Sequence, residues 1–591
     1  MIKTLAKSIR EYKTVSILTP TMVSLEVLLE VFIPFITSDL ITYMQKSGGQ
    51  MELSRIAIYG VVLVVMAMAS LLTGMLSGKF CATASTGFAK NLRRDMYYRV
   101  QQYSFGNIDK FSTSSLITRM TTDVTNVQMA YMLIIRIAVR TPLMLICCIV
   151  MTFFVNVYMA LIYLIVAPIV GLALFLIAFK VKPIFTKVFK KYDAMNESVQ
   201  ENVRAARVVK AYVREDYEKE KFATKADNIK GDFTRAEKIL ALNSPVMQFA
   251  IYACMLLVAI LGSLLVVNSQ NGAVDTTFGK LEVGDISSLI SYAFMMLQSL
   301  MMIAMIAVMV SMAATSAQRI KEVLDEESTL HNPENPVTEV KDGSISFKDV
   351  SFSYVNDPEK LSLFDVDLEI PSGATVGILG GTGSSKTTLV QLIPRLYDTT
   401  LGSVFVGGRD VKEYDLDTLR NNVAMVLQKN TLFSGTIKEN MRWGDLNATD
   451  EEIEEACRQA QADSFIQTFP NKYDTYIEQG GTNVSGGQRQ RLCIARALLK
   501  KPKIIIFDDS TSAVDTKTDA LIRKALKENI PGTTKIFIAQ RISSVQDADI
   551  IIVLDGGKIV AKGTHDELMA TSSLYREIYE AQTRGRQEEE E

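Results

Sequence analysis

The sequence predicts a multi-domain protein in which an α-helical transmembrane domain of six spans precedes a soluble α/β domain. The chain has 591 residues, too many for one ordinary domain. Its long apolar runs lie in the first half, and each is long enough to cross a bilayer, which takes roughly 20 residues. In the second half, short apolar runs alternate with helical patterns, as expected of strands buried in a parallel sheet.

Six apolar stretches are the candidate membrane spans. They lie near residues 15–40, 55–78, 131–154, 157–179, 244–268 and 286–312. Lys and Arg gather before the first stretch and in the connections 79–130 and 180–240, whereas the connections 41–54 and 269–284 carry one lysine each. This asymmetry predicts that both termini and the two long connections are cytoplasmic, in a multi-pass protein of the cell (plasma) membrane.

The segments around the spans complete the predicted domain organisation. Residues 1–14 form a basic amphipathic elbow, because the apolar run that follows is too long for a signal peptide. The two long connections have helical patterning, so the adjacent spans should continue beyond the membrane as long helices. The transmembrane domain is therefore 15–320, followed by a polar linker 321–341, the α/β domain 342–582 and an acidic tail 583–591 that we expect to be disordered.

A candidate phosphate-binding loop follows the apolar run ATVGIL. Its residues are Gly380, Gly381, Thr382, Gly383, Ser384, Ser385, Lys386, Thr387 and Thr388, and an apolar helix begins there. A loop between strand and helix surrounds phosphates with backbone N–H groups, while the lysine adds positive charge and the Thr387 hydroxyl can bind Mg²⁺. The usual pattern has Gly immediately before the Lys. If the loop needs a positive φ at that position, the side chain of Ser385 is unfavourable.

A second motif, KIIIFDD, lies downstream of this loop. It predicts an apolar strand that delivers Asp508 to a Mg²⁺-bound water. Such a strand is weak evidence alone, but its place after a phosphate-binding loop makes it strong. The two motifs together predict a site for ATP and Mg²⁺.

Between these motifs lies a segment that resembles the signature of ATP-binding cassette (ABC) proteins. Its residues are Val484, Ser485, Gly486, Gly487 and Gln488. Essentially the whole chain is similar to a type IV ABC exporter half, with an ABC-type nucleotide-binding domain. The segments 111–124 and 201–216 resemble the cytoplasmic coupling loops of such exporters.

The resemblance implies roles for further residues. Tyr354 matches the aromatic residue that stacks on adenine, and Gln428 matches the glutamine that meets Mg²⁺ and the attacking water. Asp515 matches the D-loop aspartate. Cassettes of this family work in pairs, with each ATP held between the phosphate-binding loop of one chain and the signature of the other.

Two catalytic positions depart from the active family pattern. Asp509 stands where a Glu follows the strand aspartate, and Gln540 stands where a His is usual. An Asp carboxylate is set back by roughly 1–1.5 Å, enough to misplace a base. With Ser385, these departures predict a degenerate site that holds ATP and hydrolyses it weakly or not at all. The intact signature predicts a heterodimer with a second half-transporter that has the Glu and His. A homodimeric lipid or peptide exporter is the alternative.

The cargo is less constrained. We expect hydrophobic compounds such as drugs, lipids or small peptides, in contact with the bilayer. Glu26 and Glu30 in the first span either attract cationic substrates or pair internally with Arg136 or Arg140, and the second interpretation is favoured. The methionines of the sixth span suit either promiscuous apolar binding or ordinary packing.

Other classes of function are separated by simple features. The net charge of −2 argues against a nucleic-acid partner. The fusion of spans and cassette argues against an importer, and the spans exclude a soluble ABC ATPase. An ATP-gated channel or regulatory receptor stays open, because gating would use the same motifs.

Overall fold

The computed structural model describes residues 2–47, 52–270, 281–509 and 514–590 and divides the chain into two compact units. The first unit comprises Met1–Gln102 and Ser112–Glu326. The second comprises Tyr103–Phe111 and Glu327–Glu591.

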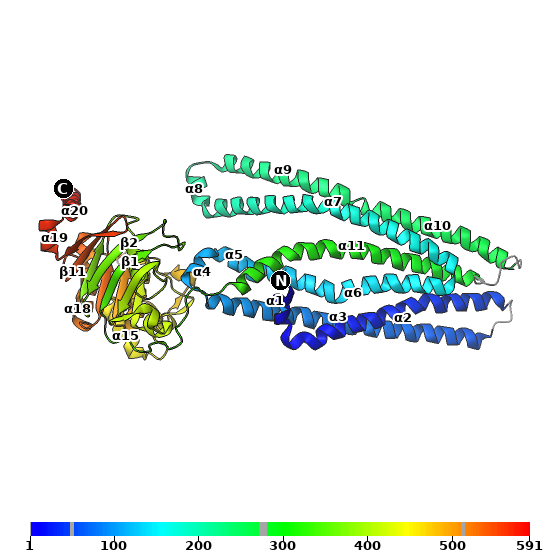
Figure 1. The fold of residues 1–591 in the computed structure, drawn as a ribbon, viewed down its shortest axis with the longest axis horizontal. Coiled ribbons are helices and arrows are strands. Elements are labelled where there is room, and N and C mark those ends of the chain that lie inside the picture. Colours follow the sequence, from blue (N-terminus) through cyan, green and yellow to red (C-terminus); the bar gives the residue numbers. More distant parts are fainter. Residues whose placement is uncertain (1, 48–51, 271–280, 510–513, 591) are drawn as a thin grey trace. The chain divides into compact units, whose positions relative to one another are not determined.

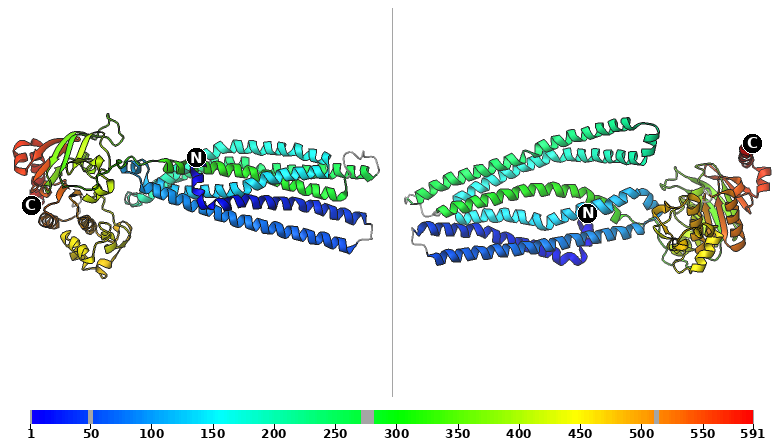
Figure 2. Two further views of the ribbon diagram at one scale, coloured as in Figure 1. Left: turned by 60° about the horizontal axis from the view of Figure 1, so that its bottom comes forward. Right: turned by 180° about the vertical axis from the view of Figure 1, so that it is seen from behind.

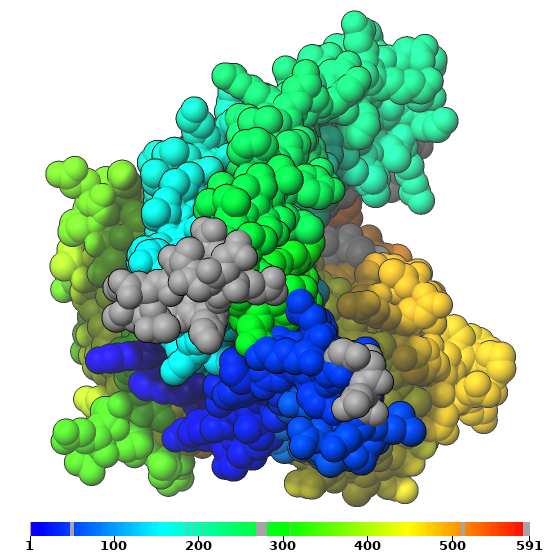
Figure 3. Space-filling view, turned by 90° about the vertical axis from the view of Figure 1, so that its right-hand side faces the viewer, coloured from blue at the N-terminus to red at the C-terminus, as the bar shows by residue number. Residues whose placement is uncertain are grey.

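The first unit is a bundle of long helices (Figure 1). The helices are α1 (Ile2–Ala6), the 3₁₀ turn η1 (Lys7–Tyr12), α2 (Lys13–Lys46), α3 (Leu53–Gln101), α5 (Thr113–Thr118), the π turn η2 (Arg119–Asp123), α6 (Val124–Val155), α7 (Val157–Arg204), α8 (Ala206–Ala211), α9 (Glu215–Leu240), α10 (Asn243–Gln270) and α11 (Val283–Asp325). Among the described residues, six helical segments are long and apolar enough to cross a membrane, which confirms the six predicted spans. Figure 3 looks at one end of this bundle, where α2 and α3, in blue, lie side by side.

Several helices are far longer than a bilayer requires. The helix α3 has 49 residues and α7 has 48. At a rise of 1.5 Å per residue each reaches about 70 Å, against an apolar bilayer core of about 30 Å. The structure therefore confirms that the spans continue as long helices into the polar connections.

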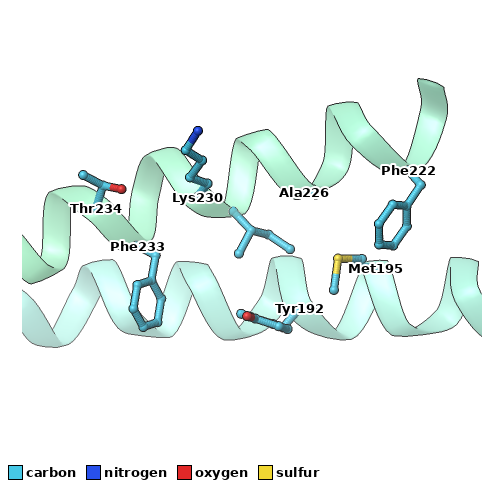
Figure 4. Close-up of a pocket in the computed structure, with 8 residues that line it drawn as sticks. Tyr192, Met195, Phe222, Ala226, Lys230, Phe233 and Thr234 are labelled. Atoms are coloured by element: carbon cyan, nitrogen blue, oxygen red, sulfur yellow. The ribbon is translucent and has the colours of Figure 1, made fainter. Parts of the chain in front are cut away.

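The polar ends of α7 and α9 pair through an apolar seam (Figure 4). Phe222 and Phe233 of α9 point toward α7, where Tyr192 and Met195 lie opposite them, and Lys230 points away from the seam. The phenyl rings of Phe233 and Phe185 are in edge contact, with centroids 5.8 Å apart. A groove of 340 Å³ remains between the two helices.

The two glutamates of the first span are paired within the bundle. Arg140 of α6 forms ion pairs with Glu26 and with Glu30, the latter at 2.7 Å between Nη2 and Oε2. Charged groups in an apolar environment need such partners. This confirms the internal partnership with Arg140 that the sequence favoured.

The second unit is built on three sheets. Its strands are β1 (Ile345–Phe352), β2 (Leu363–Ile370), β3 (Thr375–Leu379), β4 (Leu401–Val406), β5 (Arg409–Asp410), β6 (Val423–Val426), β7 (Gly435–Thr436), β8 (Tyr476–Ile477), β9 (Ile504–Asp508), β10 (Thr534–Ile538), β11 (Ile550–Asp555) and β12 (Lys558–Gly563). The sheet orders are β2-β1-β4-β5, β12-β11-β3-β10-β9-β6 and β7-β8.

Helices cover these sheets (Figure 2). They are α4 (Phe105–Lys110), α12 (Lys386–Gln391), α13 (Leu416–Asn422), α14 (Ile437–Met441), α15 (Asp450–Gln459), α16 (Asp463–Ile466), α17 (Gly486–Leu499), α18 (Thr516–Asn529), α19 (His565–Thr571) and α20 (Ser573–Glu590), with short 3₁₀ turns at Val411–Glu413, Lys472–Asp474, Gln479–Gly481 and Ile542–Ser544. In the central sheet β11, β3, β10, β9 and β6 run parallel. Every residue of β9 and β10 is buried, as the apolar runs KIIIF and KIFIA predicted.

Two features of this unit differ from the predicted boundaries. The helix α20 extends to Glu590, and the disorder expected of the acidic tail 583–591 stays a prediction. Its Arg, Gln and Glu residues have good helix propensity and simply prolong the helix. The segment 103–111 also groups with this unit, since Asn107 donates to the carbonyl of Glu327 at 2.9 Å and the Ser104 and Thr329 hydroxyls are 2.7 Å apart.

Candidate nucleotide-binding site

The candidate site lies at the carboxyl ends of four neighbouring parallel strands. In the order β3, β10, β9 and β6, these strands are followed by the phosphate-binding loop, Gln540, Asp508–Asp509 and Gln428. The carboxyl ends of parallel strands meet at one edge of the sheet, which is where open α/β sheets bind ligands. The fold thus collects residues that are up to 160 positions apart in the sequence.

The loop between β3 and α12 has the backbone geometry of a phosphate cradle. Gly380 and Gly383 have positive φ values of 157° and 83°. A Cβ on Gly380 would lie 2.2 Å from the carbonyl oxygen of Leu554, so only glycine fits there. Ser385 has φ 70° and ψ 26°, in the left-handed region. The position therefore does need a positive φ, which disfavours a side chain by about 1–2 kcal/mol.

Lys386 lies on the carbonyl groups of its own loop. Its Nζ donates to Gly380 O at 2.9 Å and to Gly381 O at 2.7 Å. Burial lowers the pKa of this lysine, and the carboxylates of Asp509 and Asp508 oppose the shift. An ammonium group held at the mouth of the loop is placed to receive a phosphate oxygen.

Thr387 and Asp508 form a pair of oxygen ligands. The Thr387 hydroxyl donates to Asp508 Oδ1 at 2.9 Å, and Asp508 is 2% exposed. Burial raises the pKa of Asp508, partly offset by this hydrogen bond. Mg²⁺ usually takes one or two protein oxygens together with phosphates and waters, so this pair fits the ion.

The carboxylate of Asp509 is held by two side-chain amides. Gln540 Nε2 donates to Asp509 Oδ2 at 2.9 Å, and Gln428 Nε2 makes a longer contact with the same oxygen at 3.4 Å. The backbone carbonyl of Gln540 accepts from Nε2 of Gln582, in α20, at 2.8 Å. This short network fixes both positions that depart from the active family pattern.

Tyr354 belongs to an aromatic cluster that includes the segment 103–111. Its ring is perpendicular to that of Tyr397, with centroids 5.2 Å apart, and Phe105 packs on Tyr397 at 6.1 Å. Tyr397 donates its hydroxyl hydrogen to Asp109 at 2.6 Å. Tyr354 remains 48% exposed, with its hydroxyl 2.9 Å from that of Thr388. Tyr354 is therefore held by aromatic neighbours and is still partly accessible.

The signature segment begins the helix α17. Ser485 is the N-cap: its Oγ accepts from Gln488 N at 3.2 Å, and its N–H donates to Gln488 Oε1 at 2.9 Å. The first turn contains Gly486 and Gly487, which have no side chains of their own to cover their N–H groups. Such a helix N-terminus favours an anion.

Asp515 caps the next helix, α18, by accepting from Thr518 N at 3.0 Å. This hydrogen bond lowers the pKa of Asp515. The preceding D-loop residues 510–513 lie outside the described part of the chain.

Sequence reasoning missed three contributors to this site. None of them belongs to a recognisable motif, and each is brought to the site by the folding of distant segments: these residues are Tyr397, Asp109 and Gln582. No local signal could have identified them, although an aromatic residue shortly after the phosphate-binding helix was visible.

Comparisons with known proteins agree with this geometry. Residues 21–300 match a family model described as ABC transporter transmembrane region, and residues 363–512 match one described as ABC transporter. The chain is 36% identical over 531 residues to an uncharacterized ABC transporter ATP-binding protein, YfiB of Bacillus subtilis, which covers 90% of each chain. It is 32% identical over 588 residues to an uncharacterized ABC transporter ATP-binding protein of Mycobacterium tuberculosis, covering 99% of this chain and 98% of that protein.

Two further similarities bear on function and fold. A probable multidrug resistance ABC transporter ATP-binding/permease protein of Bacillus subtilis, YheI, is 34% identical over 415 residues, or 70% of this chain and 69% of that protein. The solved structure of a bacterial Atm1-family ABC exporter with ATP bound superposes with a TM-score of 0.82, at 23% identity, over 97% of this chain and 99% of that chain. The second similarity shows that the fold is shared.

Proposed function

This chain belongs to the ABC transporter family, and from that premise we propose that it is one half of a heterodimeric ATP-driven exporter with a degenerate ATP site of its own. The family match covers both the membrane spans and the cassette. An ABC ATPase domain implies that the assembled transporter hydrolyses ATP. The proposal adds that this chain's own site contributes little to the turnover.

The first part of the proposal is that the site binds ATP. The N–H groups from Gly380 to Thr388 and the ammonium of Lys386 hold the triphosphate, and Tyr354 stacks on the adenine. Thr387, Asp508 and Gln428 hold Mg²⁺, which supplies charge neutralisation for the β- and γ-phosphates when bound. The backbone geometry of the loop supports this assignment.

The second part is that hydrolysis at this site is weak, and one observation carries it. Asp509 Oδ2 accepts from the Gln540 amide at 2.9 Å. A general base must reach the proton of the attacking water. Here the shorter carboxylate is held toward a neutral amide at the position where the active pattern has a histidine. Neither side chain is then placed to aim water at the γ-phosphate.

The third part concerns the partner. Ser485 and the N–H groups at the start of α17 are intact, so this chain supplies donors to the ATP bound by a second half-transporter with the usual Glu and His. Closure of the paired cassettes around cytoplasmic ATP passes through the coupling segments to the spans. The contact of Phe105 and Asp109 with Tyr397 supports this route, because Tyr397 also packs on Tyr354.

The fourth part concerns the cargo. We assign hydrophobic compounds as the cargo. The candidate membrane spans among the described residues are six apolar helices, and one relative is described as a probable multidrug resistance transporter. Directional, ATP-dependent accumulation of a fluorescent hydrophobic compound in inverted membrane vesicles tests this. ATP-dependent equilibration without accumulation would indicate a channel.

The decisive experiment measures ATP binding and ATP hydrolysis by the chain alone, in detergent or in nanodiscs. It should bind a fluorescent ATP analogue and turn ATP over very slowly, whereas co-expression with its partner should give brisk turnover. Brisk hydrolysis by the isolated chain, or vanadate-dependent trapping of nucleotide behind its Lys386 at ordinary turnover rates, would contradict the degenerate site and favour the homodimer.

A further inference from the structure

A surface groove lies where the N-terminal segment meets α3. It has a volume of 430 Å³, and its lining residues are Tyr12, Ala82, Thr83, Thr86, Gly87 and Lys90. We call it the elbow groove. It lies within the first unit, whereas the residues assigned above to ATP belong to the second.

The ring of Tyr12 forms one wall of the elbow groove, and Gly87 allows it to do so. A Cβ on Gly87 would lie 2.3 Å from Cζ of Tyr12, so the ring rests directly on the helix backbone. Arg10, with φ 41° and ψ −115°, turns the chain into this position. The wall is therefore built by a close approach that only glycine permits.

The N-terminal segment is fastened to α3 just beyond the groove. Ser8 Oγ and Arg10 Nη2 both donate to the carboxylate of Asp95 at 2.7 Å. The buried amide of Asn91 donates to Ser8 O at 3.1 Å and to Glu11 Oε2 at 3.2 Å. These polar contacts hold Tyr12 over α3.

The groove continues an apolar stripe on the outside of α3. The stripe consists of exposed residues at helical spacing: Val61, Val65, Met68, Leu72 and Met75. Only 6% of the most apolar window of α3 is buried, against 28–35% for the other five spans. The stripe runs on through Lys79 to Ala82, Thr83, Thr86 and Lys90, which are exposed on the same face.

The groove begins in the headgroup layer of a bilayer and continues on the aqueous side of that layer. The apolar stretch of α3 ends at Gly78, and Thr83 and Thr86 follow at roughly 7–12 Å along the axis. The headgroup layer begins at the edge of the apolar core and is roughly 5–8 Å thick, so Thr83 lies at its outer edge and Thr86 beyond it. Tyrosine rings are favoured near this interface, and the long lysine side chains on either side of the groove can extend toward a phosphate there.

The charge around the groove is positive. Lys79 and Lys90 lie on its face, Lys13 follows Tyr12, and Arg94 lies one turn beyond Lys90. Two carboxylates lie close by: Asp95 is paired with Arg10, and Glu11 has a pKa that is lowered chiefly by a backbone hydrogen bond and also by Arg94 and Lys90. Basic residues next to a span attract anionic lipids.

We propose that an anionic phospholipid of the bilayer occupies the elbow groove. Its phosphate lies beside Lys90 and Lys79 against the ring of Tyr12, and its acyl chains follow the apolar stripe of α3. The Thr83 and Thr86 hydroxyls donate to carbonyls of their own helix, at 3.0 and 2.7 Å, so they give the groove a polar floor and the lysines provide the recognition.

The test uses the full chain in nanodiscs of phosphatidylcholine mixed with phosphatidylglycerol. Native mass spectrometry counts the phosphatidylglycerol retained after release from the bilayer. The double variant Lys79→Ala/Lys90→Ala should bind phosphatidylglycerol about 10- to 30-fold more weakly and lose one retained molecule. The matched control Lys180→Ala/Lys190→Ala removes two exposed lysines at the polar end of the α7 span and should retain it.

A second variant separates the groove from general charge. Thr86→Trp fills the groove and keeps every lysine, so it should lose the same lipid. The assignment would be overturned if Thr86→Trp retained that lipid or if the two double variants lost it equally. Displacement of the lipid by excess glycerol phosphate would also overturn it. ATP binding by each variant should match that of the unaltered chain, which keeps this test independent of the proposed ATP site.

Discussion

The phosphate-binding loop and the catalytic edge of the same site hold their polar groups in different ways. In the loop, backbone groups from Gly380 to Ser385 define the cradle, and Lys386 rests on two backbone carbonyls. At the edge, the Asp509 carboxylate accepts from side chains, and Gln540 donates to it at 2.9 Å. A cradle made of backbone tolerates a changed side chain, as Ser385 shows by adopting a left-handed conformation. Aiming a water depends on the reach of one carboxylate, which a single methylene alters.

The largest expected effect comes from rebuilding the catalytic edge. In the chain alone, Ser385→Gly/Asp509→Glu/Gln540→His should raise ATP turnover by about 100-fold, because general acid–base catalysis contributes roughly 10²–10⁴-fold. Asp509→Glu by itself should gain less than about threefold, since Gln540 and Ser385 remain. Turnover is measured by phosphate release at saturating ATP.

The control for this rebuilding adds Lys386→Ala to the triple variant. That change removes the charge at the mouth of the loop and should return turnover to the level of the unaltered chain. If the triple variant hydrolyses ATP no faster than the unaltered chain, the side chains of the catalytic edge are not what limits hydrolysis at this site.

The next effect tests whether the intact signature serves another site. In a complex of this chain with the proposed partner, Ser485→Ala should lower ATP turnover by about tenfold, because the proposal makes Ser485 a donor to the partner's ATP and that donor is lost. Loss of a helix cap alone also costs about 1 kcal/mol. The matched control is Thr449→Ala, which breaks an equivalent capping box at α15.

The two substitutions should lower thermal stability similarly, whereas only Ser485→Ala should slow the complex. Equal turnover in both complexes would mean that Ser485 acts as a helix cap and nothing more.

Local patterns account for much of the fold and for the parts of the site that the backbone builds. Hydropathy located the six spans, and short apolar runs located β3, β9 and β10. These elements could be predicted because a segment that is buried in a membrane or a sheet has to consist of apolar residues. The need for a positive φ at Ser385 could be inferred because the usual pattern has glycine at that position. The Tyr397–Asp109 hydrogen bond could not be inferred from a local pattern, since it joins residues 288 positions apart. The Gln540–Asp509 contact likewise required the order of strands in the sheet.

A smaller effect concerns the buried carboxylate of Asp508. Because burial raises its pKa in the folded protein, its stabilising contribution is complete only below the ordinary pKa of an aspartate and is lost as the pH rises through the raised value. At neutral pH the charge therefore destabilises the nucleotide-free domain. Asp508→Asn keeps an acceptor for Thr387 and should raise the melting temperature of this domain by about 2–4 °C.

The same variant should lose the extra thermal stabilisation that ATP with Mg²⁺ gives over ATP with EDTA. Differential scanning fluorimetry of the full chain measures both quantities. The exposed Asp555→Asn is the control and should change neither. A fall in melting temperature without nucleotide would contradict the assigned sign.

The smallest effect returns to Ser385. Ser385→Gly removes the left-handed strain but makes the unfolded chain more flexible, so the net gain in stability should be below about 1 kcal/mol. Lys472 has a similar φ of 44° on an exposed turn remote from the loop, and Lys472→Gly should gain a similar amount. Only Ser385→Gly should also tighten ATP, by no more than about threefold, as measured by titration with a fluorescent analogue. A tenfold or greater tightening would mean that the backbone cradle depends on its side chains as strongly as the catalytic edge does.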